Sequence, residues 1–167
     1  MGSSENKEEK PKIISISEKE ALSKEFNKLK YSDQIPVVKC EYVNNDPKHW
    51  RVVFKGSDCS PYEDGYFIIE FKFNKGNFPE YGPDCYFITK MYHPNIYENG
   101  FVCIKYLSNW DPKRSIESVL LGILEIMDNP IPDHGYSNDA TSLLKKEKDE
   151  FIKKVEEYTF QYAMKSF

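Results

Sequence analysis

The chain has 167 residues, of which 40% are hydrophobic and 15% aromatic. This length is enough for one domain with a well-buried core and short for two domains. Its formal net charge is −4, and its lysines are interspersed with glutamates instead of forming a basic patch. This charge pattern disfavours a nucleic-acid-binding surface, because phosphate contacts need clustered cations. We therefore expect proteins as partners and no nucleic acid.

The cysteines indicate the redox compartment of the protein, and the apolar runs indicate whether it contacts a membrane. Cys40, Cys59, Cys85 and Cys103 contain no Cys-x-x-Cys pair and no zinc-like spacing. We expect all of them to be reduced, which fits a cytoplasmic location or, as the alternative, a nuclear one. The longest apolar run, residues 118–127, is interrupted by a glutamate and is about half of the ~20 residues that a membrane span requires. We expect a buried helix there and no membrane contact.

The chain should begin with a tail and then a helix. Residues 1–12 hold six charged residues and no large apolar side chain after Met1, a composition that predicts disorder, so we expect the folded domain to cover residues 13–167. Ser17 and Glu20 have the spacing of a capping box. Apolar residues then recur at helical spacing, which predicts an amphipathic helix over residues 17–31.

From residue 37 the apolar period changes to two, which is typical of strands. Runs rich in β-branched and aromatic residues are separated by turn clusters and predict a four-stranded antiparallel meander. The predicted strands are residues 37–43, 50–55, 66–73 and 85–89. In the third strand one face should carry the core and the other should be partly wet. The core face would consist of Phe67, Ile69, Phe71 and Phe73.

The C-terminal part should be helical. Ser115 can cap a helix whose apolar residues cover more than half of its circumference, so this helix should be the most buried. The segment Asn129-Pro130-Ile131-Pro132 should end it, because proline lacks the N–H that a helix needs. Two further helices are predicted at residues 138–145 and 148–164. An N-terminal helix, a meander and three C-terminal helices make an α+β domain.

The residues with the clearest chemistry lie between the meander and these helices. Tyr92-His93-Pro94-Asn95 is followed by the turn dipeptide Asn99-Gly100 and then by Cys103. With Trp110-Asp111-Pro112 downstream, this stretch resembles the active-site signature of ubiquitin-conjugating enzymes. Two other blocks resemble further motifs of the family: Ser60-Pro61-Tyr62-Glu63-Asp64-Gly65 resembles its S-P-Y-x-G-G turn, and Asn129-Pro130-Ile131-Pro132 followed by Asn138-Asp139-Ala140 resembles its N-P-x-P…N-x-x-A crossover.

The resemblance implies a UBC-like fold and a thioester carrier. Such an enzyme accepts ubiquitin or a ubiquitin-like modifier from an activating enzyme and passes it to a substrate lysine with a ubiquitin ligase, or to a ligase cysteine. Cys103 would be the nucleophile. No metal or organic cofactor is implied, because thioester exchange is near isoenergetic and the activating enzyme consumes the ATP. The expected partners are therefore the modifier, the activating enzyme, the ligase and the substrate protein.

The roles of the neighbouring residues follow from the same resemblance. The Asn95 amide could hydrogen-bond the developing oxyanion, or it could brace the loop through backbone contacts, and both can hold together. His93 and Pro94 are expected to be structural, and a Cys–His dyad is disfavoured. The position that activates the incoming lysine in relatives, commonly with an acidic residue, is occupied by His134, with Asp133 beside it. Either side chain is a candidate for this role.

Other departures and rivals remain. Lys105 would disfavour an approaching ammonium, while Glu80 and a short Cys103–Trp110 segment put the usual set of ligases in doubt. Within the fold, the chain could carry a different modifier. A rival of another class is a non-catalytic UBC-fold scaffold that binds ubiquitin or a partner enzyme, which Cys103 and the complete His-Pro-Asn argue against. A cysteine hydrolase is disfavoured because nothing supplies an orienting group for His93.

Overall fold

The computed structural model describes residues 14–102, 105–135 and 138–164. The predicted tail and Cys103 lie outside these residues. The secondary structure consists of α1 (Ile16–Lys30), β1 (Val37–Tyr42), the 3-10 turn η1 (Val43–Asn45), β2 (His49–Lys55), β3 (Tyr66–Lys72), β4 (Asp84–Phe87), α2 (Lys105–Ser108), α3 (Ile116–Asp128), the 3-10 turn η2 (Pro132–His134), α4 (Asn138–Lys146) and α5 (Lys148–Tyr162). None of the described helices is long and apolar enough to cross a membrane.

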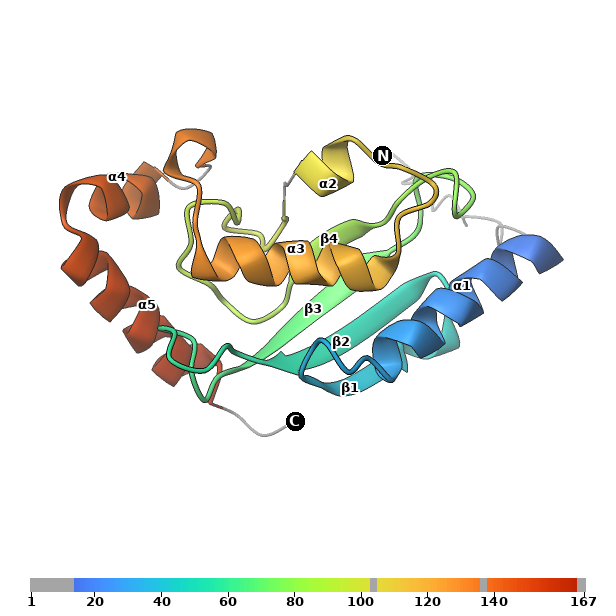
Figure 1. Cartoon of the computed structure of the whole chain (residues 1–167), viewed down its shortest axis with the longest axis horizontal. Helices are drawn as coiled ribbons and strands as arrows, with labels where there is room; N and C mark the ends of the chain where they lie inside the picture. The colour runs from blue at the N-terminus through green and yellow to red at the C-terminus, as the bar shows by residue number, and fades with distance from the viewer. Residues whose placement is uncertain (1–13, 103–104, 136–137, 165–167) are drawn as a thin grey trace, which may run out of the picture.

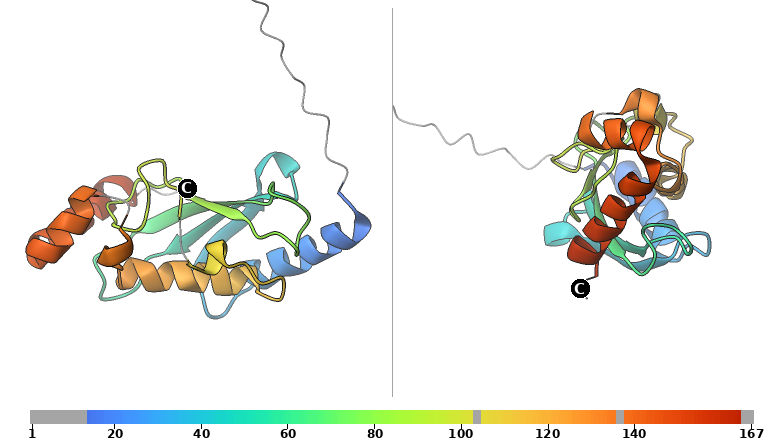
Figure 2. Two further views of the ribbon diagram at one scale, coloured as in Figure 1. Left: turned by 90° about the horizontal axis from the view of Figure 1, so that it is seen from above. Right: turned by 90° about the vertical axis from the view of Figure 1, so that its left-hand side faces the viewer.

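The strands form one antiparallel sheet in the order β1-β2-β3-β4, as predicted. Helix α3 lies across one face of this sheet, α1 packs beside β1 and α3, and α4 with α5 form the opposite end of the molecule (Figure 1). The view from above shows the same order from α1 to α5 along the long axis (Figure 2). The α+β class is therefore confirmed.

The core lies between α3 and the inner face of the sheet. Phe67, Ile69, Phe71 and Phe73 are each at most 1% exposed, so the predicted core face of β3 is confirmed. Helix α3 is capped by Ser115 and is buried along most of its length, also as predicted. Trp50 on β2 is fully buried in an aromatic cluster and donates its indole N–H to the Pro47 carbonyl at 2.6 Å.

Several predicted boundaries differ from the structure by one or two residues, and two of them do so for local reasons. Helix α1 is capped by Ser15, whose hydroxyl accepts the Glu18 N–H at 3.1 Å, whereas Ser17 lies inside the helix. Strand β4 ends at Phe87 and not at Thr89, because the Thr89 hydroxyl takes the place of a backbone acceptor and binds the Ile68 N–H at 2.8 Å. In both cases a side chain competes with the backbone for one hydrogen bond.

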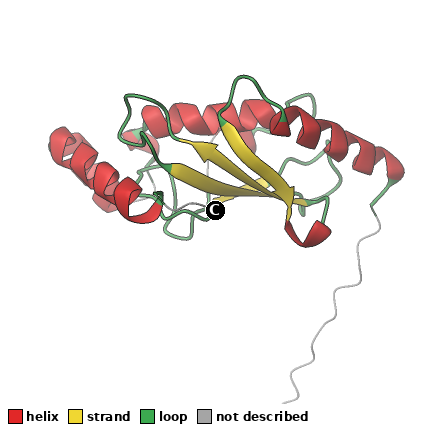
Figure 3. Ribbon diagram, turned by 90° about the horizontal axis from the view of Figure 1, so that it is seen from below, coloured by secondary structure: helices red, strands yellow, loops and turns green. Residues whose placement is uncertain are grey.

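The sequence also gave no sign of α2, and it placed Glu70 on the wet face of β3. This carboxylate is only 5% exposed because side chains from β2 cover it. Arg51 donates to it at 2.7 Å and His49 contacts it at 2.7 Å. The face of the sheet away from α3 therefore carries a charged cluster over otherwise half-buried residues. Figure 3 shows the strands from below, with helices along one side of the sheet.

A second buried carboxylate joins α1 to the loop before β4. Glu18 is 3% exposed, and one of its oxygens accepts the Lys48 ammonium at 2.7 Å and the Phe78 N–H at 2.9 Å. Removing it would leave the Lys48 ammonium without its anion, with only the Gly76 carbonyl as a partner, and the Phe78 N–H without its acceptor. Such losses are costly in a desolvated site. Glu18 thus links α1 to the loops before β2 and before β4.

We predict that Glu18→Ala lowers the free energy of unfolding by about 3 kcal/mol, because the lost acceptor served both a charge and a buried N–H. Urea denaturation of the variant measures this change. Glu20→Ala, on the exposed face of the same helix, is the matched control and should change stability by less than about 0.5 kcal/mol. Equal effects of the two substitutions would contradict the assigned link.

Candidate active site

The segment that leads to Cys103 is a hairpin held against β4. Tyr97 donates its N–H to the Phe101 carbonyl at 3.0 Å, and Gly100 donates to Tyr97 at 2.8 Å. Gly100 has φ +83°, and an added Cβ would collide with the Phe87 carbonyl oxygen, so a glycine is required there. Val102, which is fully buried, donates to the Cys85 carbonyl at 3.0 Å. The chain is therefore fixed up to the residue before Cys103.

His93 lies beneath this hairpin and is only 1% exposed. Its Nδ1 accepts the Asn95 N–H at 3.0 Å, so the ring proton sits on Nε2, which donates to the Ile126 carbonyl at 2.7 Å. Burial lowers the pKa of His93 to about 4, which keeps the ring neutral at physiological pH. Both nitrogens are thus engaged, and this geometry favours the structural role over that of a base.

Asn95 connects this segment to the residues after α3. Asn95 is 3% exposed, and its Oδ1 accepts a hydrogen bond from the Ile131 N–H at 2.8 Å. The two protons of its amide go to the Ile131 carbonyl at 2.9 Å and the His134 carbonyl at 3.2 Å. Both N–H donors of the amide and one of the two lone pairs of its oxygen are therefore used. We call this set of contacts the Asn95 bridge.

The two candidate lysine-activating residues lie on the turn that the Asn95 bridge holds. Asp133 and His134 belong to η2, and both side chains are exposed. The Lys145 ammonium lies 2.9 Å from an Asp133 oxygen, and this hydrogen bond and charge lower the pKa of Asp133. The structure therefore brings His93, Pro94 and Asn95 together with Asp133 and His134. It does not describe Cys103, the remaining member of the predicted site.

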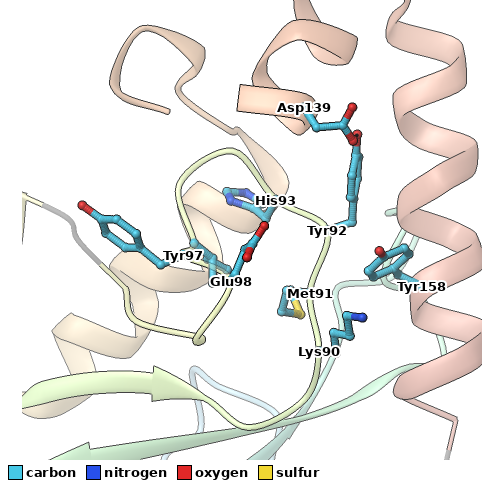
Figure 4. A pocket seen from close by; sticks show the side chains of 9 residues that line it. Lys90, Met91, Tyr92, His93, Tyr97, Glu98, Asp139 and Tyr158 are labelled. Atoms are coloured by element: carbon cyan, nitrogen blue, oxygen red, sulfur yellow. Dashed lines mark hydrogen bonds between the residues drawn. The ribbon is translucent and has the colours of Figure 1, made fainter. Parts of the chain in front are cut away.

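A contact that the sequence did not reveal joins the site to the C-terminal helices. The Tyr92 hydroxyl donates to Asp139 at 2.7 Å, and the Lys154 ammonium lies 3.2 Å from the same oxygen and 4.6 Å from the centre of the Tyr92 ring. Figure 4 shows Tyr92 extending from the loop toward Asp139, beside a cavity of about 410 Å³. Asp139 belongs to the Asn138-Asp139-Ala140 block, so its position could have indicated a role.

The described cysteines are poor candidates for the nucleophile. Cys40 and Cys85 are buried, and desolvation raises the pKa of Cys40 to about 12 and that of Cys85 further still. A thiol in such surroundings stays protonated and inert. Cys59 is exposed in the turn that connects β2 and β3. It is 34 residues before His93 in the chain and belongs to none of the loops that form the candidate site.

Comparison with known proteins gives consistent matches. Residues 21–159 fit the profile of the family described as "Ubiquitin-conjugating enzyme". The chain is 35% identical over 145 residues to "Ubiquitin-conjugating enzyme E2 13" of Saccharomyces cerevisiae, covering 86% of this chain and 94% of that protein. It is 33% identical over 144 residues to "Ubiquitin-conjugating enzyme E2 N" of Drosophila melanogaster, with coverages of 86% and 94%. It is 31% identical over 137 residues to "Ubiquitin-conjugating enzyme E2 2" of Candida glabrata, with 81% of each chain covered.

The buried neutral state of His93 predicts a pH dependence of stability. Its pKa falls from 6.5 to about 4 on folding, so its contribution is complete above pH 6.5 and is lost as the pH falls toward 4. That loss amounts to about 3 kcal/mol. The difference in unfolding free energy between wild type and His93→Gln, measured in urea, should shrink by about this amount across that range. His134→Gln is the exposed control and should keep the wild-type slope; a constant wild-type–His93→Gln difference would contradict the assignment.

Proposed function

The chain belongs to the ubiquitin-conjugating enzyme family, and on that premise we propose that Cys103 is the residue that carries the modifier. The protein is a transferase that carries ubiquitin as a thioester, and it interacts with ubiquitin, an activating enzyme and ligases. Which ligases and substrates it serves, and whether it works in the cytoplasm or the nucleus, belong to the proposal: we place it in the cytoplasm, with protein substrates.

The proposed reaction has two exchanges at one carbonyl. The Cys103 thiolate attacks the thioester that ubiquitin forms with the activating enzyme, a new carbon–sulfur bond forms, and the old thiolate leaves. A neutral lysine amine then attacks the same carbonyl, an isopeptide bond forms, and the Cys103 thiolate departs while the amine gives up a proton. Neither exchange needs a metal or an organic cofactor, since the energy is already in the thioester.

One observation carries the assignment of Cys103. The hairpin of residues 96–102 is fixed to β4, and its last described residue, Val102, pairs with Ile96, which directly follows Asn95. Cys40 and Cys85, by contrast, are buried and have raised pKa values. A non-catalytic scaffold is not favoured, because it would need neither this cysteine nor the complete His-Pro-Asn sequence.

We further propose that the primary role of Asn95 is to brace the loops and that any catalytic role is secondary. Its two amide protons are already bonded to backbone carbonyls of Ile131 and His134. To stabilise an oxyanion, the amide would have to exchange one of these partners, and the bond to His134 is the longer of the two at 3.2 Å. Oxyanion donors contribute roughly 3–4 kcal/mol to such barriers, so the exchange would be energetically worthwhile.

The incoming lysine must lose its charge, because with a reference pKa near 10.4 only about one lysine in a few thousand is neutral at pH 7. We propose that His134 or Asp133 accepts its proton. Asp133 is held by Lys145, which neutralises much of its attraction for an ammonium. This ion pair leaves His134, on the same turn, as the first candidate and Asp133 as the second.

We predict that Cys103 alone forms the thioester. With activating enzyme, ATP and ubiquitin, Cys103→Ser should give at most an ester that survives reducing agent, whereas Cys40→Ser, Cys59→Ser and Cys85→Ser should charge normally when folded. Non-reducing and reducing gels of the same reactions distinguish the adducts. Loss of charging in a folded Cys59→Ser protein that retains Cys103 would overturn the assignment.

We predict that discharge of the thioester onto free lysine is weak near pH 7 and rises between pH 6 and 7.5 more steeply than lysine ionisation explains. A neutral imidazole can accept a proton, whereas its cationic form repels an ammonium and cannot take a proton. His134→Asp should raise the single-turnover rate and remove the excess steepness, while transfer to a ligase cysteine should change little.

The control for this prediction is a set of variants on the same turn. If Asp133 is the acceptor, Asp133→Ala should abolish discharge and Lys145→Gln should increase it by freeing the carboxylate. A wild-type pH profile that coincides with that of His134→Ala would exclude His134 from the reaction.

A further inference from the structure

Three aromatic side chains form a continuous surface beside the end of the hairpin, and we call Tyr86, Phe101 and Tyr97 the aromatic strip. The ring centres of Tyr86 and Phe101 are 5.3 Å apart, and those of Phe101 and Tyr97 are 5.8 Å apart. Tyr97 is 39% exposed, and the other two are half-buried. Rings in such contact, left open to solvent on one side, have the composition of an interaction surface.

The backbone holds the aromatic strip rigidly. Tyr86 and Phe101 form an antiparallel bridge, and Phe87 donates its N–H to the Gly100 carbonyl at 2.8 Å. Tyr97 and Phe101 are joined across the turn by a further hydrogen bond of 3.0 Å. A ligand that contacts these rings would therefore lose little free energy in ordering them, since they are fixed before binding.

The aromatic strip includes Phe101, one of the last two described residues before Cys103. Phe101 is two residues before Cys103 in the chain, and between them Val102 points into the core. Tyr86 pairs with Glu70 across β3 and β4, which places the far end of the strip on the face of the sheet away from α3. Figure 4 shows Tyr97 extending from its loop on the side away from Tyr92 and Tyr158.

A cationic cluster marks the far end of the aromatic strip. The Lys72 ammonium lies 5.0 Å from the centre of the Tyr86 ring and 3.7 Å from Glu70. Arg51 also donates to this single carboxylate, at 2.7 Å. Two permanent cations share one anion, so the cluster retains positive charge that can attract a carboxylate of a partner.

We propose that the aromatic strip binds the substrate segment that flanks the acceptor lysine, an inference that rests on the proposed function of Cys103. In order outward from Cys103, the segment presents its lysine, a large apolar side chain next to it on Phe101 and Tyr97, and an acidic side chain near Lys72. The Phe101 and Tyr86 ring centres are 5.3 Å apart, and the Lys72 ammonium lies 5.0 Å from the Tyr86 ring centre. An extended chain advances about 3.3 Å per residue, so the acid lies about two to three residues beyond the apolar one. The strip would make Tyr97, Phe101 and Lys72 determinants of substrate specificity.

The test uses synthetic acceptor peptides and the full-length, charged enzyme. One peptide carries lysine, leucine, serine and glutamate in this order; a second has the reverse order, because the strip fixes the sequence of side chains and not the chain direction. A third replaces leucine and glutamate by serine. The measured quantity is the single-turnover rate with each peptide divided by the rate with free lysine, for the same enzyme preparation.

For the wild type, the ratio for the better of the first two peptides should exceed that for the serine peptide by about tenfold or more. Phe101→Ser and Tyr97→Ser should each remove most of this preference. Phe160→Ser is the matched control, because Phe160 is an aromatic residue 77% exposed on α5, and it should keep the wild-type ratio. Unchanged ratios in both strip variants would overturn the proposal.

A charge reversal makes the test independent of any damage that loss of a ring causes. Lys72→Glu should lower the ratio for the glutamate peptide and restore it for a peptide with arginine at that position; failure of this exchange would overturn the part assigned to Lys72. If Phe101→Ser slows charging and discharge onto every acceptor alike, the strip contacts the tail of the modifier and the proposal is wrong. If the wild type forms no thioester at Cys103, it is the proposed function that fails.

Discussion

The side-chain amide of Asn95 joins two loops that are 36 residues apart in the chain. One loop contains His93 and leads into the hairpin before Cys103, and the other contains Asp133 and His134. The Asn95 bridge makes three hydrogen bonds to the backbone of Ile131 and His134. These bonds hold the turn that contains the two candidate lysine-activating residues against the segment that precedes Cys103. Each of these groups, if left buried and unpaired, would cost about 1–3 kcal/mol.

His93 supports the bridge from below. It orients Asn95 by accepting its N–H, and it anchors the segment to α3 through the Ile126 carbonyl. Because burial holds its pKa near 4, the ring remains neutral and keeps the single tautomer that both contacts need. The His-Pro-Asn sequence therefore has a structural role, because it fixes the positions of the loops around the candidate site. Proton transfer is left to residues of the exposed turn.

Parts of this arrangement were predictable from the sequence, and others depended on partners distant in the chain. The alternation of Phe67, Ile69, Phe71 and Phe73 identified the core face of β3, because burial there follows directly from strand geometry. Local signals also gave the cap of α3 at Ser115. The prediction of Ser17 as the cap of α1 was wrong, because Ser15 caps the helix and Glu18, three residues later, is buried against Lys48.

The candidate site divides in the same way. The order of His93, Pro94, Asn95 and Cys103 pointed to a thioester carrier through a family resemblance, and the sequence left open whether Asn95 braces or catalyses. Its partners at Ile131 and His134 belong to another loop, so no local pattern could reveal that its protons are occupied. The contact of Tyr92 with Asp139 joins residues 47 positions apart, so no local pattern predicts it either, although Asp139 lies in a block that resembles a family motif.

We conclude that the Asn95 bridge, and not packing alone, fixes the turn of residues 131–134 beside the segment that precedes Cys103. Native-state hydrogen exchange of the Ile131 amide tests it most directly, because this N–H is bonded to the Asn95 carbonyl oxygen at 2.8 Å. In Asn95→Ala the Ile131 amide should exchange about tenfold or more faster than in wild type, while amides in the middle of α3 keep their protection. An Ile131 amide that exchanges at the wild-type rate in the variant would contradict the claim.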